Sequence, residues 1–220
     1  SFWMKRSEIT GSGTAVRSDI GFQTPTEGML SLALSGTGTD DLLKFVSGEG
    51  TYKIYPNMLF RDPGAWYHVL AVMDTAAAQA VNRMLIYVNG QEQTSLFTAA
   101  YPTLNYESSY NDAVSHTISK SGANGMDGYL SQMAFIGGTA MKPSDFGEFN
   151  NGVWRPIDIT GLDYTGTNSF LLDFADSSDL GNDVSGNDND FSSSGLDAAD
   201  RMVDTPTNNY CTFSVLNEYT

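Results

Sequence analysis

Residues 66–74 read WYHVLAVMD and residues 84–91 read MLIYVNGQ, and these two runs decide the fold class. Both are apolar and contain β-branched and aromatic residues, which favour strands. The second run ends in Asn89-Gly90, a pair that supplies the two positive φ angles of a type I′ turn, so we expect a β-hairpin there. Residues 75–83 include a run of three alanines, but the segment is too short and uncapped for an independent helix, and we interpret it as a loop.

The first of these runs is largely apolar on both of its faces, which is expected of a strand in the interior of a sheet. His68 lies on this strand and is one of two histidines in the chain. A histidine on a sandwich strand is more often a hydrogen-bonded structural residue than a catalytic base, so we assign it no chemistry. Alternation places Trp66, His68, Leu70 and Val72 on one face and Tyr67, Val69, Ala71 and Met73 on the other.

Short alternating segments continue through the first 149 residues, about ten residues apart and separated by Gly and Asp. This spacing is typical of an all-β, two-sheet antiparallel sandwich or jelly roll. One helical turn is expected at residues 143–149. Further strands are expected at residues 1–5, 29–34, 42–46, 51–55, 114–119 and 126–136.

Composition limits the function classes that remain open. The chain has 220 residues, of which 40% are hydrophobic, enough for a real core. Its net charge of -15 argues against nucleic-acid binding, which needs clustered Lys and Arg. The lone Cys211 excludes an intramolecular disulfide, and no apolar run is long enough to span a bilayer. Residues 1–5 already have the pattern of a mid-strand segment, so we expect the N-terminal strand to be truncated.

A polar loop at residues 98–112 carries three tyrosines among Asn, Ser and Thr. A tyrosine ring offers an apolar face to a sugar while its hydroxyl makes a hydrogen bond, and a loop of this length is often functional. The alternative is that the tyrosines pack the loop onto the sandwich. The candidate glycan-binding residues are Tyr101, Tyr106 and Tyr110.

Five blocks occur along the first part of the chain: FWMKR at residues 2–6, WYHV at 66–69, IYVNG at 86–90, DGYL at 127–130 and MKPSDFG at 141–147. In this order they resemble the laminin-G-like branch of the concanavalin A-like lectin and glucanase superfamily. The resemblance covers residues 1 to about 149 and implies a jelly-roll sandwich, in agreement with the strand spacing.

The superfamily includes glucanases, so an enzyme is the rival class. Retaining glycosidases need two carboxylates about 5 Å apart, which on one strand come from acids two or four residues apart. None of the glutamates has such a partner on a recognisable strand, and the Glu-x-Asp-x-Glu pattern of the glucanase branch is absent. We therefore predict that the chain is not an enzyme.

We interpret residues 1–149 as the sandwich domain. Residues 150–220 differ from it in composition, because they are rich in Asp, Asn, Ser and Gly. They form either a loop-rich C-terminal extension that packs back onto the sandwich or the start of a second module. A strand is expected at 168–174, and the polar loop GNDVSGNDNDF follows at 181–191. This loop resembles the Asp-Ser-Ser-Gly-Asn-Gly-Asn motif that often opens laminin-G-like domains.

Four oxygen-bearing side chains alternate in the polar loop, so that they can converge on one calcium ion. The match to a helix-loop-helix calcium site is partial, because Asp188 stands where the sharp-turn glycine would be and no bidentate glutamate follows. The alternative is a chain of Asx turns that satisfies its own backbone. The candidate calcium ligands are Asp183, Ser185, Asn187 and Asn189.

The same order of blocks, with DTPTNNY at residues 204–210, is similar to virion proteins of tailed phages from marine bacteria, which are lectin-like tail or fibre proteins. This resemblance implies a module on the exposed outer surface of the virion, in a tail fibre or spike, that binds host-surface glycan. The alternative is a capsid decoration or tail adaptor that makes only protein–protein contacts. Either way, the expected partners are other virion proteins and further copies of the chain, as a trimer or higher oligomer.

Overall fold

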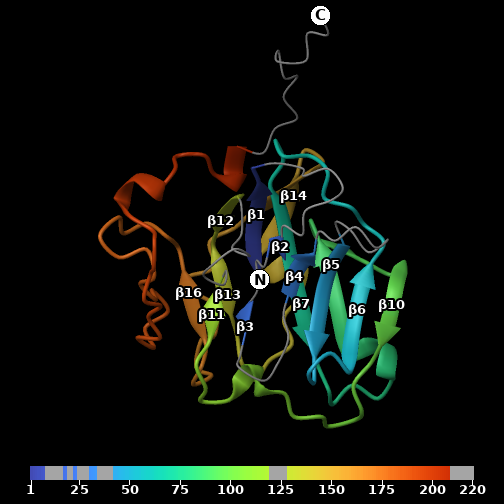
Figure 1. Cartoon of the computed structure of the whole chain (residues 1–220). Helices are drawn as coiled ribbons and strands as arrows, with labels where there is room; N and C mark the ends of the chain where they lie inside the picture. The colour runs from blue at the N-terminus through green and yellow to red at the C-terminus, as the bar shows by residue number, and fades with distance from the viewer. Residues whose placement is uncertain (8–16, 19–21, 24–29, 34–41, 119–127, 209–220) are drawn as a thin grey trace, which may run out of the picture.

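The computed structural model describes residues 1–7, 17–18, 22–23, 30–33, 42–118 and 128–208. Two five-stranded antiparallel sheets pack against each other in it (Figure 1). The first sheet consists, in spatial order, of β12 (Gly128–Ser131), β1 (Phe2–Arg6), β7 (Tyr67–Met73), β8 (Met84–Val88) and β9 (Gln91–Glu92). The second consists of β10 (Leu96–Ala100), β6 (Tyr52–Pro56), β5 (Leu42–Ser47), β4 (Leu30–Ala33) and β2 (Arg17–Ser18).

Three two-stranded ladders complete the described strands, and the helices of the described residues are single 3-10 turns. The prediction of an all-β antiparallel sandwich is therefore confirmed. Among the described residues no helix has the length and hydropathy to cross a bilayer. The ladders are β3 (Phe22–Gln23) with β11 (Thr117–Ile118), β13 (Met133–Phe135) with β16 (Phe170–Leu172), and β14 (Gly147–Asn150) with β15 (Val153–Pro156). The 3-10 turns are η1 (Ala80–Asn82), η2 (Ser109–Asn111), η3 (Pro143–Asp145), η4 (Ala198–Asp200) and η5 (Pro206–Asn208).

The hairpin predicted from Asn89-Gly90 is confirmed. Asn89 has φ 48° and Gly90 has φ 77°, and Val88 pairs with Gln91 across the turn. The preceding strand β7 pairs with β8 over its whole second half, and η1 is the only regular structure in the predicted loop at residues 75–83. The three strands thus form a meander, with β7 in the centre of its sheet.

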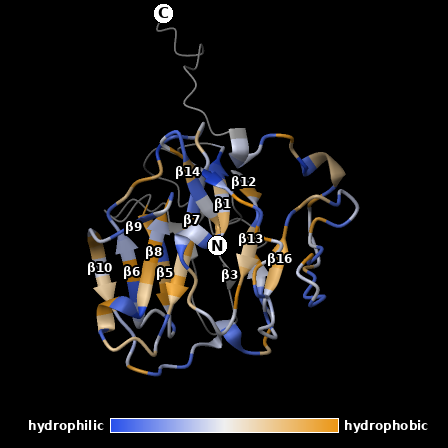
Figure 2. Cartoon of the chain, turned by 180° about the vertical axis from the view of Figure 1, so that it is seen from behind, coloured by the Kyte–Doolittle hydropathy of each residue, from blue (hydrophilic) through white to orange (hydrophobic). Residues whose placement is uncertain are grey.

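Both faces of β7 are covered, as its sequence predicted. Tyr67 and Val69 belong to the sandwich core, which also contains Phe45 and Ile54 of the second sheet. The opposite face packs against a second apolar cluster formed with the C-terminal half of the chain. In Figure 2 the apolar residues concentrate in strands such as β5, β8, β13 and β16. The second cluster consists of Leu70, Val72, Ala134, Phe146, Ile159, Tyr164 and Leu171.

The structure differs from the sequence prediction at residues 126–136, which were expected to form one long strand. Gln132 has φ 44°, and this left-handed residue separates β12 from β13. The two strands then pair with different partners, β12 with β1 and β13 with β16. Apolar residues flank the polar pair Ser131-Gln132 on both sides, so the segment was interpreted as one strand and the break was missed.

Chain segments beyond residue 149 pair with strands from the first 149 residues and pack against the sandwich. The predicted domain boundary, between residues 149 and 150, falls within β14, which pairs with β15, and β16 pairs with β13. The expected strand at 168–174 is limited to Phe170–Leu172, and the helical turn expected at 143–149 is η3 followed by β14. Cys211, and residues 126–127, 119, 29, 34 and 209–210 of the predicted segments, lie outside the described residues.

The turn after β8 depends on the absence of a side chain at Gly90. A Cβ at this position would lie 2.6 Å from the Trp154 ring. We expect Gly90→Ala to lower the free energy of unfolding by about 1–2 kcal/mol more than Gly152→Ala does. Gly152 is the matched control because it has φ 80°, close to the 77° of Gly90, but open space around its Cβ position. Urea denaturation measures the difference, and equal effects of the two variants would contradict the role of Trp154.

Candidate functional site

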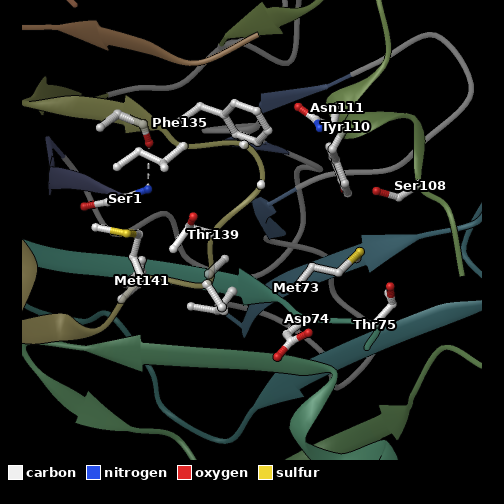
Figure 3. A pocket seen from close by; sticks show the side chains of 18 of the residues that line it. Ser1, Met73, Asp74, Thr75, Ser108, Tyr110, Asn111, Phe135, Thr139 and Met141 are labelled. Atoms are coloured by element: carbon white, nitrogen blue, oxygen red, sulfur yellow. Dashed lines mark hydrogen bonds between the residues drawn. The ribbon is translucent and has the colours of Figure 1, made fainter. Parts of the chain in front are cut away.

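A cleft of about 360 Å³ opens beside the end of β7. Three segments far apart in the sequence line most of it: residues 70–76, 106–111 and 133–141. Figure 3 shows Met73, Asp74 and Thr75 on one side of this cleft, across from Phe135 and Asn111. Small-molecule sites have volumes of roughly 300–1,000 Å³, so the cleft has the size of a site for a small ligand.

The base of the cleft is apolar. It is lined by Phe2 of β1, Leu70 of β7 and Phe45 of β5, which are at most 6% exposed. Met133 and Phe170 extend this surface through the β13–β16 ladder. The cleft therefore rests on the rigid core of the sandwich, and it is not only a gap between loops.

The rim of the cleft is polar. Asp74 and Thr75 follow β7 directly, and the Asp74 Oδ1 accepts a hydrogen bond from the Ala76 amide N at 3.2 Å. Glu107 and Asn111 are exposed on the opposite segment. Carboxylate, amide and hydroxyl groups thus surround an apolar base, an arrangement typical of ligand sites. The polar side chains of the rim are Asp74, Thr75, Glu107, Ser108, Asn111 and Thr139.

Hydrogen bonds from other elements fix the loop that carries the tyrosines. The Arg83 Nη1 donates to the Pro102 carbonyl at 3.0 Å, and the Asn105 amide N donates to the Thr75 carbonyl at 2.8 Å. At the far end of the loop, Asn168 Nδ2 donates to the Asp112 carbonyl at 2.9 Å. The loop is tied to the segment after β7, so two walls of the cleft are held together.

The three predicted tyrosines have different surroundings. Tyr110 is 8% exposed, its ring packs in the core, and its hydroxyl donates to the Val46 carbonyl. Tyr106 is half-buried, lies edge to face with Tyr52 at 4.7 Å between ring centroids, and lines the cleft. Tyr101 packs against the core cluster and is not among the residues that line the cleft. The structure thus brings Tyr106 and Tyr110 together at one cleft, where Tyr110 anchors the loop.

Sequence reasoning missed the polar residues of the other two walls. Asp74 and Thr75 come directly after the most clearly predicted strand, and Thr139 follows Gly137-Gly138 at the end of another. Polar residues that follow strands at one end of a sandwich were the available signal. The pairing of those strand ends in space was not visible in the sequence.

A family model of the concanavalin A-like lectin/glucanase superfamily, of the laminin G type, matches residues 1–144. The chain belongs to this superfamily. The matched region contains all three segments that form the walls of the cleft. No curated protein and no solved structure matched the chain.

The polar loop at residues 181–191 lies beyond the region matched to the superfamily, and Asp183 is its centre. This residue is 6% exposed. Its Oδ1 accepts hydrogen bonds from the amide N atoms of Leu171 at 2.8 Å and Ser185 at 2.9 Å. Its Oδ2 accepts from the Ser185 Oγ at 2.9 Å and from the Asn189 amide N at 3.0 Å. These four bonds match the number of acceptor positions that a carboxylate offers.

The two asparagines of the predicted calcium site direct their amide nitrogens to backbone carbonyls. Asn187 Nδ2 donates to the carbonyls of Tyr164 at 2.6 Å and Ser169 at 2.9 Å. Asn189 Nδ2 donates to the Ser169 carbonyl at 2.9 Å. In the described part of the chain no cluster of three or more His, Cys, Asp or Glu side chains is placed to hold a metal. The loop is cross-linked by hydrogen bonds to the segment before β16.

Calcium binding by this loop stays a hypothesis with a direct test. A calcium ion needs oxygen lone pairs that the Asp183 carboxylate already shares with four donors. We expect calorimetric titration with calcium to give no heat and no rise in melting temperature. A rise in melting temperature that disappears in Asn189→Ala would contradict this expectation and support calcium ligation by Asp183 and Asn189.

Proposed function

We propose that this chain is a non-enzymatic, lectin-like module of a phage tail fibre or spike that binds host-surface glycan in the cleft. The concanavalin A-like fold is compatible with a carbohydrate-binding module. The observation that supports the proposal most directly is the combination of an apolar base and a polar rim, whose three main wall segments lie within the part matched to the superfamily. The module is proposed to be displayed on the outer surface of the virion as a trimer or higher oligomer.

The chemistry of the cleft suits a sugar. A pyranose ring has an apolar C–H face and a periphery of hydroxyl groups. Tyr106 offers part of an aromatic ring at the cleft, while Ser108 and Asn111 supply hydroxyl and amide groups from the same segment. Thr75 and Thr139 add hydroxyls from the other walls. Both faces of a sugar would thus find complementary groups.

The acids of the cleft do not favour hydrolysis. A glycosidase acid is kept protonated by apolar surroundings, whereas Glu107 is exposed. Asp74 accepts a backbone hydrogen bond in an Asx turn. These observations agree with the absence of the Glu-x-Asp-x-Glu pattern from the sequence. They support a binding module in preference to a glucanase.

The placement on a virion rests on the order of the sequence blocks and on the segment at residues 204–210. A second candidate function is a capsid decoration or tail adaptor that makes only protein–protein contacts. This alternative is supported by large apolar side chains at the surface. Phe97, Leu104 and Phe149 are each 54% exposed, and they are candidate contact residues for a protein partner.

Two tyrosine variants test the glycan-binding proposal. We expect Tyr106→Ala to weaken glycan binding by about tenfold or more, because a stacked aromatic ring contributes on the order of 1 kcal/mol beyond its buried area. Tyr101→Ala is the matched control, since Tyr101 is also half-buried but does not line the cleft. Binding is measured on a glycan array and then by calorimetry, and the melting temperature of each variant reports its folding.

The outcomes separate the two candidate functions. Glycan binding that is lost in Tyr106→Ala and retained in Tyr101→Ala supports the cleft as the site. The reverse pattern would place the site elsewhere on the molecule. If the purified module binds other virion proteins and no glycan, the adaptor function is supported instead.

A further inference from the structure

We infer that the cleft selects uncharged glycans and rejects glycans that carry carboxylate or sulfate groups at the bound residue; this inference rests on the proposed function. It is based on the distribution of charge around the cleft. Asp74 and Glu107 stand on two of its walls. None of the described residues that line it is a lysine, arginine or histidine.

An acidic sugar needs a cation, because carboxylate and sulfate groups are held in proteins by charge-assisted hydrogen bonds from Arg and Lys. The Arg83 guanidinium lies beside the segment after β7, but it donates to the carbonyls of Ala77, Ala78 and Pro102. Lys142 follows the last lining segment and its own side chain does not line the cleft. Ser1 also lines the cleft, but its amino group donates to the Ala134 carbonyl at 2.9 Å, and burial lowers the pKa of this amine to about 5. Among the described residues, no charged basic group is therefore placed to neutralise a bound anion.

The carboxylates of Asp74 and Glu107 also repel an anionic sugar. Like charges repel, and solvent screens this repulsion only in part at short distance, so an anion near either rim carboxylate is disfavoured. The net charge of -15 gives the whole molecule a field of the same sign. A neutral sugar avoids both costs.

The apolar part of the cleft explains how a neutral sugar is held without ion pairs. Met73, Phe135 and Met141 are half-buried and contribute to its lining from two different walls. Methionine adapts its shape to irregular apolar surfaces, and together with Phe135 it gives the C–H face of a sugar a place to pack. Affinity then comes from apolar contact and neutral hydrogen bonds.

The test uses matched pairs of glycans that differ only at C6: glucose-terminated against glucuronic-acid-terminated oligosaccharides, and galactose-terminated against galacturonic-acid-terminated ones. The intact chain is expected to bind the acidic member of a pair about tenfold more weakly or worse. In Asp74→Asn/Glu107→Gln the ratio of the two affinities should fall. Glu92→Gln/Glu148→Gln is the control, because it changes the net charge equally at exposed residues outside the cleft and should leave the ratio unchanged.

Failure of this inference is distinguishable from failure of the proposed function. Preferential binding of the acidic members overturns the inference and leaves glycan binding intact. An affinity ratio that changes equally in both double variants would also overturn it, because the selection would then come from the overall charge. Absence of binding to every glycan contradicts the proposed function and the inference with it. Melting temperatures of the double variants verify that each one is folded.

Discussion

Asp183→Ala is expected to lower the free energy of unfolding by about 3 kcal/mol or more. The reason is the burial of this carboxylate, which is 6% exposed and accepts four hydrogen bonds. Truncation removes all four bonds at once. It leaves the amide of Leu171, a residue that is 1% exposed, without its acceptor. Urea denaturation of the two proteins measures the loss.

Two further variants make this expectation specific. Asp188→Asn is the control, because Asp188 lies in the same loop but is exposed. Asp183→Asn keeps the shape of the side chain and replaces one acceptor oxygen by a donor, so it should also destabilise. Hydrogen exchange at the Leu171 amide gives a local readout and should accelerate in both Asp183 variants. Unchanged protection of that amide would contradict the proposed role of the carboxylate.

The effect should extend beyond the loop itself. Leu171 belongs to the apolar cluster that covers the outer face of β7, and β16, on which it lies, pairs with β13. Through its hydrogen bond with the Leu171 amide, Asp183 therefore links the polar loop to β16 and so to the sandwich. If residues beyond 149 fold as part of one unit with the sandwich, Asp183→Ala should lower a single cooperative transition. Two separate transitions would indicate a second module.

Short-range rules explain what the sequence predicted well. The turn at Asn89-Gly90 was predictable because two positive φ angles are a local property of that residue pair. The central position of β7 was predictable because alternation left both of its faces apolar. The pattern indicated that apolar residues pack against both faces of this strand, but it did not identify the segment that packs on the outer face. The residues that cover the outer face of β7 are far away in the sequence: Leu171 is 101 positions from Leu70, and no local pattern encodes their contact.

The tyrosine loop shows the same limit at the candidate site. Tyr101, Tyr106 and Tyr110 all lie in one loop that contains Asn, Ser and Thr, so they had equal standing as candidates. Their difference arises from long-range contacts: the Val46 carbonyl captures the hydroxyl of Tyr110, and Tyr52 packs against Tyr106. The sequence therefore identified one wall of the cleft and could not rank the residues within it.

The polar loop illustrates a chemical ambiguity. The alternation of Asp183, Ser185, Asn187 and Asn189 was interpreted through their oxygens, which are calcium ligands in other loops. An asparagine side chain also carries a nitrogen donor, and its role depends on what lies opposite. Here the carbonyls of Tyr164 and Ser169 lie opposite the amides, so the nitrogens are used. Only the fold could supply those carbonyls.

His68 is expected to make the protein sensitive to acid. Its ring is fully buried and packs against the rings of Trp3, with centroids 5.0 Å apart, Trp154 at 5.9 Å and Phe146 at 6.0 Å. Nε2 is within hydrogen-bond distance of the Ser1 Oγ, at 2.9 Å. Burial in this apolar environment lowers the pKa of His68 from 6.5 to about 3. The neutral imidazole is therefore the form that folds.

The sign of the pH effect follows from linkage. The unfolded chain takes up a proton on this histidine near pH 6.5, whereas the folded protein takes it up only near pH 3, as its lowered pKa requires. The contribution of His68 is therefore fully present above about pH 7 and is lost progressively as the pH falls. With about 1.4 kcal/mol for each pH unit, the loss reaches about 3 kcal/mol at about pH 4.

Carboxylates also respond to acid, so the measurement must isolate the histidine. We compare the free energy of unfolding of the intact chain with that of His68→Phe, which keeps an aromatic ring in the cluster and cannot be protonated. The difference between the two proteins should shift by about 3 kcal/mol between about pH 7.5 and about pH 4, in favour of the variant at low pH. In His116→Gln the remaining histidine resonance belongs to His68 and should not titrate above about pH 4. If this difference stayed constant with pH, His68 would have the same pKa in the folded and unfolded states. The histidine would then take up its proton without unfolding the protein, and the expectation would be contradicted.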